Sequence, residues 1–366
     1  MIVLFLKPVE VILVTYPDSF ILQEAKSLAE SMAGWHVTKV FTQKYLNHSE
    51  YGVGSGKAEE IRDFLKDSPN ATHVIVDEDL TSKQLFNLER LLGDVKVIDR
   101  ERLILDIFYS RATTIEAKLQ IQLAEIKYDM PRVREIAKMI SGNERPGKGG
   151  GGEYVVDVKF RDLKRQMAFI KKKLEEAKSK RELYHQQRVK TGMPIVSLVG
   201  YTSAGKTTLF NLLTSEHKET ASSLFTTLST TTRSLKLDKK TSVLLADTVG
   251  FISRLPTYMI DAFKSTLEES LQADLILLLV DSSEDLKEIQ IKYSSCWDVL
   301  KELNVDRTKV LVVLSKFDDG ANDQKIDEIT KDLQLLQEPM VISSKTGHGT
   351  HKLKNTIKQF SKAGKQ

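Results

Sequence analysis

The chain has 366 residues, of which 41% are hydrophobic, and it carries a formal net charge of +4 with a pI near 8.8. This length exceeds what one hydrophobic core usually serves, so two or three domains are expected. Its only cysteine is Cys296, which excludes an internal disulfide and favours a reducing, cytoplasmic setting. Apolar runs such as residues 275–280 fall far short of the roughly 20 residues that cross a bilayer, so no membrane span is predicted.

Residues 1–112 are predicted to form a small, mostly parallel α/β domain, because short β-rich runs alternate with amphipathic segments. Gly52, Gly54 and Gly56 form a glycine-spaced loop before a helix. They do not match the full dinucleotide-binding spacing, so a structural turn or an RNA-facing loop is favoured over a second nucleotide site. The predicted strands are 11–15, 37–41, 73–77 and 95–98, and the predicted helices are 19–33, 57–66 and 82–91.

Residues 113–191 are predicted to form an antiparallel helical hairpin. The first helix covers 113–140, with an interruption expected at Pro131. The second runs from about 157 to 188, and the glycine-rich run 147–152 between them is expected to be a mobile tip. An alternating three-and-four spacing predicts the seam of a coiled pair at Leu163, Met167, Ile170, Leu174, Ala177 and Tyr184.

The outer faces of this hairpin are rich in lysine and arginine, with few acids nearby. Such charges form either a solvated helix surface or an RNA-facing one, and the sequence leaves both interpretations open. The basic residues are Lys164, Arg165, Lys171, Lys172, Lys173, Lys178, Lys180, Arg181, Arg188 and Lys190.

A phosphate-binding loop is predicted where the sequence fits G-x-x-x-x-G-K-[ST] after the apolar strand 195–199 and before a helix over 207–213. Backbone N–H groups of such a loop converge on phosphate oxygens. Lys206 is expected to reach the β- and γ-phosphates, and the Thr207 hydroxyl to ligate Mg²⁺. The residues predicted to hold the phosphates are Gly200, Tyr201, Thr202, Ser203, Ala204, Gly205, Lys206, Thr207 and Thr208.

Two further segments are predicted to sense the terminal phosphate. Strand 243–246 runs into Asp247, Thr248, Val249 and Gly250, where Asp247 would hold Mg²⁺ through water. The N–H of Gly250 would approach the γ-phosphate, so Lys206 and Gly250 are the predicted catalytic groups. The second segment is Phe225, Thr226, Thr227, Leu228 and Ser229, with Thr227 as a second Mg²⁺ ligand; the alternative for its threonines is a role as strand residues.

A guanine site is predicted after strand 310–314, where Ser315, Lys316, Phe317 and Asp318 resemble the Asn-Lys-x-Asp motif of GTPases. A carboxylate at Asp318 accepts both N–H groups of the guanine edge, whereas adenine lacks that donor pair. Near the carboxyl end, Ser343, Ser344 and Lys345 resemble the Ser-Ala-Lys loop that supports the base. Because the motifs occur in order at strand ends, residues 192–366 are predicted to form a doubly wound α/β GTPase domain.

These motifs together resemble the HflX GTPases. The resemblance rests on residues 200–214, 224–228, 231–233, 247–252 and 265–269, and it extends upstream to 41–43, 54–57, 97–100, 103–108 and 119–124. It implies a short, archaeal-type member that is a monomer, binds GTP, GDP and Mg²⁺, and associates with the large ribosomal subunit. Hydrolysis would be faster there, and bacterial members separate stalled ribosomes into subunits under stress.

Two departures from the family pattern concern the nucleotide. Ser203 stands where the family usually has an asparagine that helps to bind potassium, so potassium stimulation is not expected. Ser315 replaces the asparagine whose amide ties the base to the phosphate loop, so loss of that tie is expected, with guanine selectivity retained at reduced affinity. The alternative function is an NTP-gated RNA-binding or remodelling module with a separate ATP site in residues 1–112.

Overall fold

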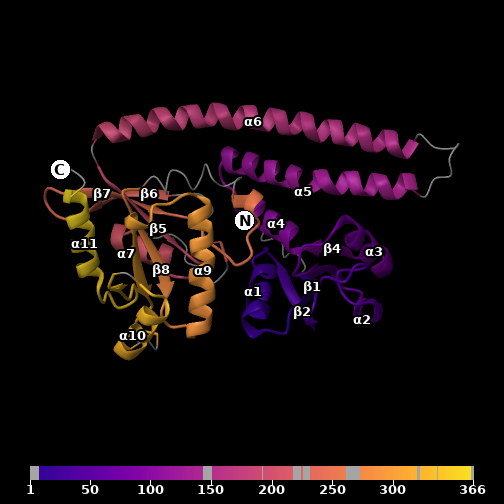
Figure 1. Cartoon of the computed structure of the whole chain (residues 1–366), viewed down its shortest axis with the longest axis horizontal. Coiled ribbons are helices and arrows are strands. Elements are labelled where there is room, and N and C mark those ends of the chain that lie inside the picture. The colour runs from indigo at the N-terminus through magenta and orange to yellow at the C-terminus, as the bar shows by residue number, and fades with distance from the viewer. Residues whose placement is uncertain are drawn as a thin grey trace, which may run out of the picture. The chain divides into compact units, whose positions relative to one another are not determined.

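The fold is taken from a computed structural model that describes residues 8–142, 151–191, 193–216, 224–225, 231–260, 273–319, 322–335 and 337–363. The chain divides into two compact units (Figure 1). The first contains residues 1–110 and 119–174, and the second contains 111–118 and 175–366. Each unit has its own sheet and its own hydrophobic core.

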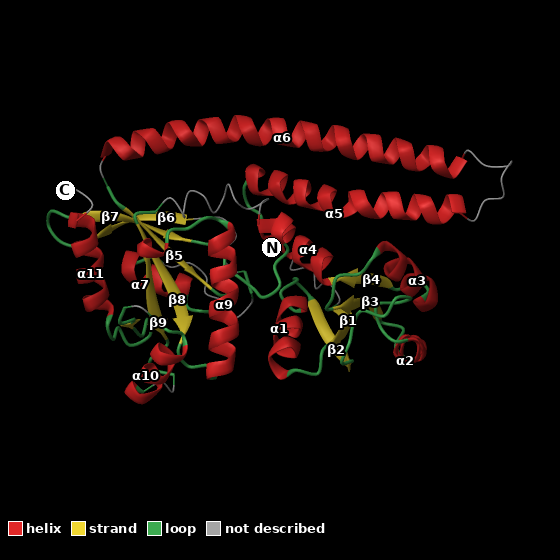
Figure 2. Ribbon diagram, viewed as in Figure 1, coloured by secondary structure: helices red, strands yellow, loops and turns green. Residues whose placement is uncertain are grey.

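The first unit is built on a four-stranded parallel sheet with the order β2-β1-β3-β4. The alternation of β-rich and amphipathic segments thus gives the predicted α/β architecture, and Figure 2 shows helices packed around this sheet. The strands are β1 (Val9–Thr15), β2 (Trp35–Thr42), β3 (Ala71–Val76) and β4 (Lys96–Asp99), and the helices are α1 (Ser19–Ala29), α2 (Ser55–Lys66), α3 (Ser82–Leu92) and α4 (Arg100–Arg111).

Protein groups already occupy much of the carboxyl edge of this sheet. Arg100 is 2% exposed and donates to Asp77 at 2.5 Å and to Glu24 at 2.9 Å. Asp99 accepts hydrogen bonds from the Tyr128 hydroxyl at 2.9 Å and from Arg132 at 2.6 Å. These pairs satisfy charges that would otherwise be costly to bury. The contacts of Tyr128 and Arg132 also attach the helix that comes after α4 to the sheet.

That helix, α5 (Ile115–Gly142), continues through Pro131, so the interruption predicted there is wrong. A proline inside a helix removes one backbone donor and crowds the preceding turn. Next to the proline, Arg132 Nη1 donates to the carbonyl oxygen of Tyr128 at 3.1 Å and Nη2 donates to Asp99, so this turn of the helix is held to the sheet. The predicted apolar stripe also differs at its start, since Ile115 is 80% exposed.

The next helix, α6 (Gly151–Thr191), begins six residues before its predicted start. Gly151 and Gly152 therefore belong to the helix and not to the tip, because a glycine can adopt helical backbone angles at an entropic cost. Residues 147–150 of the predicted tip lie outside the described residues. The antiparallel course of α5 and α6 is visible in Figure 1, and the Arg134 guanidinium lies 4.3 Å from the centre of the Phe160 ring.

The predicted seam on α6 is confirmed where side chains are described. Ile170 is buried, and the other four seam positions before residue 180 are only partly exposed, whereas the residues between them are exposed. The side chain of Tyr184, the sixth predicted position, lies outside the described part.

The second unit is built on a six-stranded sheet with the order β10-β9-β8-β5-β7-β6, in which β6 runs antiparallel to β7. The parallel strands bring their carboxyl ends, and hence the predicted motifs, to one edge. This confirms the doubly wound GTPase fold. The strands are β5 (Ile195–Gly200), β6 (Thr231–Lys236), β7 (Ser242–Asp247), β8 (Leu275–Asp281), β9 (Val310–Ser315) and β10 (Met340–Val341), and the helices are α7 (Lys206–Thr214), α9 (Leu286–Glu302), η1 (Arg307–Lys309), α10 (Asp323–Asp332) and α11 (Thr350–Ala363).

Candidate nucleotide site

The loop between β5 and α7 has the backbone of a phosphate-binding loop. Gly205 has φ +88°, a left-handed conformation that glycine adopts without strain, and α7 begins at the next residue. A Cβ at Gly200 would lie 2.4 Å from the carbonyl oxygen of Leu279 on the neighbouring strand, so only glycine fits there. The loop therefore turns sharply at both glycines and directs backbone N–H groups at the start of α7 inwards.

Lys206 lies inside this loop. Its side chain is buried, and Nζ donates to the carbonyl oxygens of Gly200 at 3.1 Å and Tyr201 at 2.7 Å. Burial lowers the pKa of Lys206 to about 8, and the charge of Asp247 opposes this shift. The two carbonyl contacts hold the ammonium group in place at the centre of the loop.

Thr207 and Asp247 come together from α7 and from the end of β7. Thr207 Oγ1 donates to Asp247 Oδ2 at 3.1 Å, and both side chains are buried. Hydroxyl and carboxylate oxygens are the hard ligands that Mg²⁺ prefers, so this donor set fits the ion. Next along the chain, Thr248 Oγ1 donates to the carbonyl oxygen of Leu198 at 2.7 Å and anchors the segment to β5.

Gly250 lies against the phosphate loop. A Cβ at this position would be 2.9 Å from Thr202 Cα and 3.1 Å from Lys206 Nζ. Any side chain here would collide with backbone that cannot move away cheaply, so glycine is required for the close approach. The structure thus places the backbone of Gly250 beside the ammonium group of Lys206.

Ser315 retains a tie between the predicted base loop and the phosphate loop. Its Oγ lies 2.8 Å from the carbonyl oxygen of Ala204 and 3.1 Å from that of Val280, and it donates to them. The expectation that the tie is lost without asparagine is therefore wrong. A hydroxyl suffices because β9 ends close enough to the loop for a short side chain to reach it.

Asp318 is held by the last predicted loop. The Ser343 hydroxyl donates to Asp318 Oδ1, and Lys345 Nζ lies 3.9 Å from Oδ2. The hydrogen bond from Ser343, aided by nearby lysines, holds the pKa of Asp318 below its ordinary value, so this carboxyl group is ionised at neutral pH. An ionised carboxylate is the form that accepts two N–H donors.

The rest of the base loop is also ordered by contacts. Lys316 has φ +57° and its Nζ lies 2.5 Å from Asp281 Oδ2. Phe317 stacks on His348 with ring centres 5.0 Å apart. Ser344 follows Ser343 in the same turn.

The second predicted phosphate-sensing segment is described only in part. Phe225 is buried and has a left-handed φ of +57°. Thr226, Thr227, Leu228 and Ser229 lie outside the described residues. Of the same threonine-rich stretch, Thr231 and Thr232 lie on β6 and pair with Asp247 and Ala246.

Three side-chain contacts at this edge were not predicted from the sequence. Asp281 pairs with Lys316, Lys292 packs over Tyr201, and the Tyr201 hydroxyl contacts the segment after Gly250. One signal was available, because Asp281 and Lys316 follow adjacent parallel strands whose register pairs Asp281 with Ser315. The contacts of Tyr201 with Lys292 and with Ser253 join segments that lie far apart in the chain, so no local sequence pattern indicates them.

Three family descriptions match the chain. They are "GTP-binding GTPase N-terminal" over residues 21–109, "GTP-binding GTPase Middle Region" over 111–188 and "50S ribosome-binding GTPase" over 195–316. The GTPase HflX of Methanocaldococcus jannaschii is 39% identical over 92% of this chain and 82% of its own length. The chain belongs to the HflX family of GTPases. The HflX of Escherichia coli is 40% identical over 81% of this chain and 69% of its own length.

Among solved structures, the complex of the protein SsGBP with GDP matches with a TM-score of 0.56 at 25% identity, covering 97% of this chain and 99% of its own. A GTP-binding protein of Sulfolobus solfataricus with GDP matches with a TM-score of 0.53. This HflX-family protein binds guanine nucleotides and hydrolyses GTP. In the parts of the chain that the structure describes, no helix is long and apolar enough to span a membrane.

Proposed function

We propose that this HflX-family protein is a GTP-driven switch that binds the large ribosomal subunit and splits or keeps apart ribosomal subunits under stress. The observation that carries the proposal is the meeting of Lys206, Gly250 and Asp318 at one sheet edge. A phosphate loop, a γ-phosphate sensor and a base-reading carboxylate at one edge form a guanine-nucleotide switch.

The guanine base would lie against Asp318 and the loop of Ser343, Ser344 and Lys345. Asp318 would accept the two base N–H groups, and the Lys316 stem would cover one face of the base. Ser315 supports this arrangement from behind, since its contact with Ala204 fixes the distance between base and phosphate loops. Two structural neighbours are complexes with GDP, which supports a guanine nucleotide as the ligand.

Thr207 would ligate Mg²⁺ directly, Asp247 would hold it through water, and Thr227 would add a ligand from the other phosphate-sensing segment. When bound, the ion supplies positive charge that stabilises the negative charge on the β- and γ-phosphates. Lys206 supplies further positive charge from within the loop, and Gly250 offers its N–H to the terminal phosphate.

Intrinsic hydrolysis is expected to be slow. Phe251 follows Gly250, at the position where Ras-type switches carry a water-orienting glutamine, and its ring is buried and has no hydrogen-bonding group. Acceleration would then come from the partner that orders the switch segments. The proposed partner is the large ribosomal subunit, in keeping with the family description of the GTPase domain.

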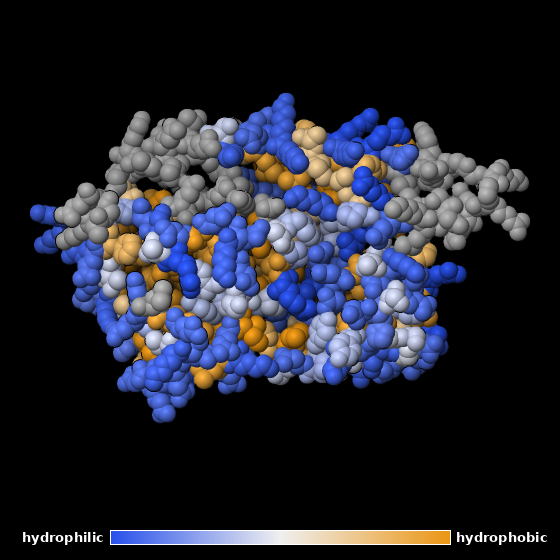
Figure 3. Space-filling model, viewed as in Figure 1, coloured by the Kyte–Doolittle hydropathy of each residue, from blue (hydrophilic) through white to orange (hydrophobic). Residues whose placement is uncertain are grey.

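The hairpin formed by α5 and α6 is the proposed contact with ribosomal RNA. Lys164, Arg165, Lys171, Lys172 and Lys173 are exposed on α6. Figure 3 shows hydrophilic side chains on either side of a hydrophobic patch along the middle of α6. Such cations neutralise phosphates and release counterions.

We also propose a three-part organisation (1–112, 113–191 and 192–366), a monomeric state and a cytoplasmic location.

The alternative, an ATP site in residues 1–112, is less well supported. Asp18 accepts hydrogen bonds from Phe20 N and Ile21 N, so its carboxylate occupies the start of α1 where a phosphate would bind. Thr81 caps α3 in the same way. A Cβ at Gly52 would lie 2.3 Å from Leu80, so close packing explains why a glycine stands at this position without a nucleotide site.

The test of the base site is Asp318→Asn. An amide at this position donates where the carboxylate accepts, which suits the second carbonyl of xanthine, so binding should move from GTP to XTP. Competition of GTP, XTP and ATP against a labelled guanine nucleotide measures the change, with Asp323→Asn on the exposed α10 as the control. A variant that keeps the parent's ratio of GTP to XTP affinity would remove Asp318 from the base site.

A further inference from the structure

The side chain of Tyr201 connects the phosphate loop to the segment that follows Gly250. Tyr201 is the second residue of the loop and is only 5% exposed. Its hydroxyl oxygen accepts a hydrogen bond from the backbone N–H of Ser253 at 2.7 Å, within buried surroundings. Ser253 lies three residues after Gly250, so the phenol holds the far end of the segment that contains the γ-phosphate sensor.

Two backbone hydrogen bonds hold the near end of the same segment. The N–H of Phe251 donates to the carbonyl oxygen of Gly200 at 3.1 Å, and the N–H of Thr202 donates to that of Phe251 at 2.8 Å. Residues 251–253 are thus attached to the phosphate loop by three hydrogen bonds. The backbone pair does not depend on residue type, but the third bond requires an acceptor at the end of the Tyr201 ring.

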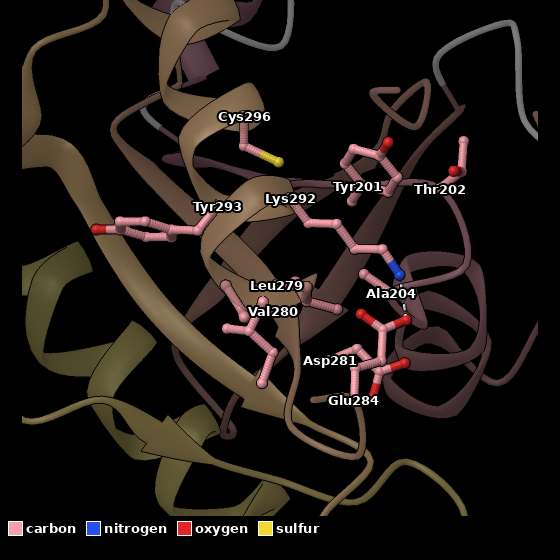
Figure 4. Close-up of a pocket in the computed structure, with 11 residues that line it drawn as sticks. Tyr201, Thr202, Ala204, Leu279, Val280, Asp281, Glu284, Lys292, Tyr293 and Cys296 are labelled. Carbon is pink, nitrogen blue, oxygen red and sulfur yellow. Dashed lines mark hydrogen bonds and ion pairs between the residues drawn. The ribbon is translucent and has the colours of Figure 1, made fainter. Parts of the chain in front are cut away.

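Helix α9 fixes the position of that ring. Lys292 Nζ lies 5.4 Å from the ring centre, within the range of a cation–π contact, and it pairs with Glu284. Figure 4 shows Lys292 reaching from α9 past Tyr201 towards Glu284, with Cys296 on the same helix lining the small cavity beneath. The phenol oxygen is therefore presented by a packed ring and needs no rearrangement to accept its hydrogen bond.

We propose that Tyr201 is a positioning residue that fixes Gly250 for the terminal phosphate and so favours GTP over GDP. Gly250 lies beside Lys206 Nζ, the group proposed to bridge the β- and γ-phosphates. Without the Ser253 bond, the segment is freer to move, and ordering it would cost part of the binding free energy of a triphosphate. A diphosphate would lack the terminal phosphate that Gly250 is proposed to contact. This inference rests on the proposed position of the phosphates in the loop.

The test is Tyr201→Phe, which keeps the ring and removes the hydroxyl that accepts the hydrogen bond from Ser253. The dissociation constant of a non-hydrolysable GTP analogue should rise about 3- to 10-fold, the worth of one buried hydrogen bond. The constant for GDP should stay within about twofold, since other loop groups hold the α- and β-phosphates. Single-turnover hydrolysis at saturating GTP should slow by a comparable factor. Tyr293→Phe, which removes a hydroxyl from the same cavity lining, is the control and should alter neither constant.

Equal losses of GTP-analogue and GDP affinity, or an unchanged ratio, would overturn the role of Tyr201. If Tyr201→Phe binds neither nucleotide, Lys292→Met is the second test, because it removes the cation beside the ring. A loss of affinity for the GTP analogue alone supports the proposal, and an equal loss of affinity for both nucleotides contradicts it. Lys206→Ala separates this question from the proposed site itself. If Lys206→Ala bound both nucleotides as the parent does, the position of the phosphates would be wrong, whatever Tyr201 does.

Discussion

At the scale of single residues, the site combines charge with burial, and Lys206 shows the consequence. Its pKa of about 8 lies below the ordinary value of 10.5 because burial disfavours the ammonium form. Between these two values the folded protein binds fewer protons than the unfolded chain, so the Lys206 contribution makes the protein more stable as pH rises through that window. Below pH 8 the lysine stays charged, at a cost to stability that phosphates would offset.

We therefore predict that nucleotide binding takes up protons above neutrality. Phosphates favour the charged lysine and raise its pKa, so GDP binding at pH 8.5 should be accompanied by uptake of a substantial fraction of a proton. At pH 6.5 uptake through Lys206 should be close to zero. Calorimetric titrations in two buffers with different ionisation enthalpies measure this uptake. Uptake that does not grow between the two pH values would mean that Lys206 is not the group that meets the phosphates.

At the scale of elements, α5 is a helix that tolerates a proline in its interior. Pro131 is exposed, and the neighbouring Arg132 makes contacts to Asp99 and to the carbonyl oxygen of Tyr128. Pro131→Ala should restore a backbone hydrogen bond and raise the free energy of unfolding by about 1–3 kcal/mol. Urea unfolding measures this change, with the exposed Glu135→Ala as the control on the same helix. A loss of stability would show that the Arg132 contacts depend on the proline.

The basic face of α6 carries the second prediction for an element. Reversing the charges of Lys171, Lys172 and Lys173 to glutamate should weaken binding to large ribosomal subunits and flatten its dependence on salt, because fewer counterions are released. Guanine nucleotide affinity should not change, since these residues lie outside the nucleotide site. Sedimentation with large subunits across a salt series measures both effects. Glu175 and Glu176 replaced by glutamine provide a control on the same helix, and an unchanged salt slope in the lysine variant would place the RNA contact elsewhere.

At the scale of the whole molecule, the sequence predicts whatever depends on neighbours in the chain. The phosphate loop, Asp247, Gly250 and Asp318 each follow a strand, and parallel strands necessarily bring such residues to one edge. The seam of α6 was predictable for the same reason, because periodicity is local. Contacts between distant segments were not predictable, and the tie made by Ser315 is one of them. Ser315 reaches Ala204 across 111 residues, and the Tyr201 contact with Ser253 spans 52.

We propose that this HflX-family protein is a guanine-nucleotide switch that responds to the large ribosomal subunit. The most direct measurement is its rate of GTP hydrolysis during titration with purified large subunits, small subunits or neither. We predict a slow basal rate, a saturable rise with large subunits, no rise with small subunits, and loss of the stimulated rate in Lys206→Ala. The same rate with and without large subunits, or an equal rise with either subunit, would contradict it.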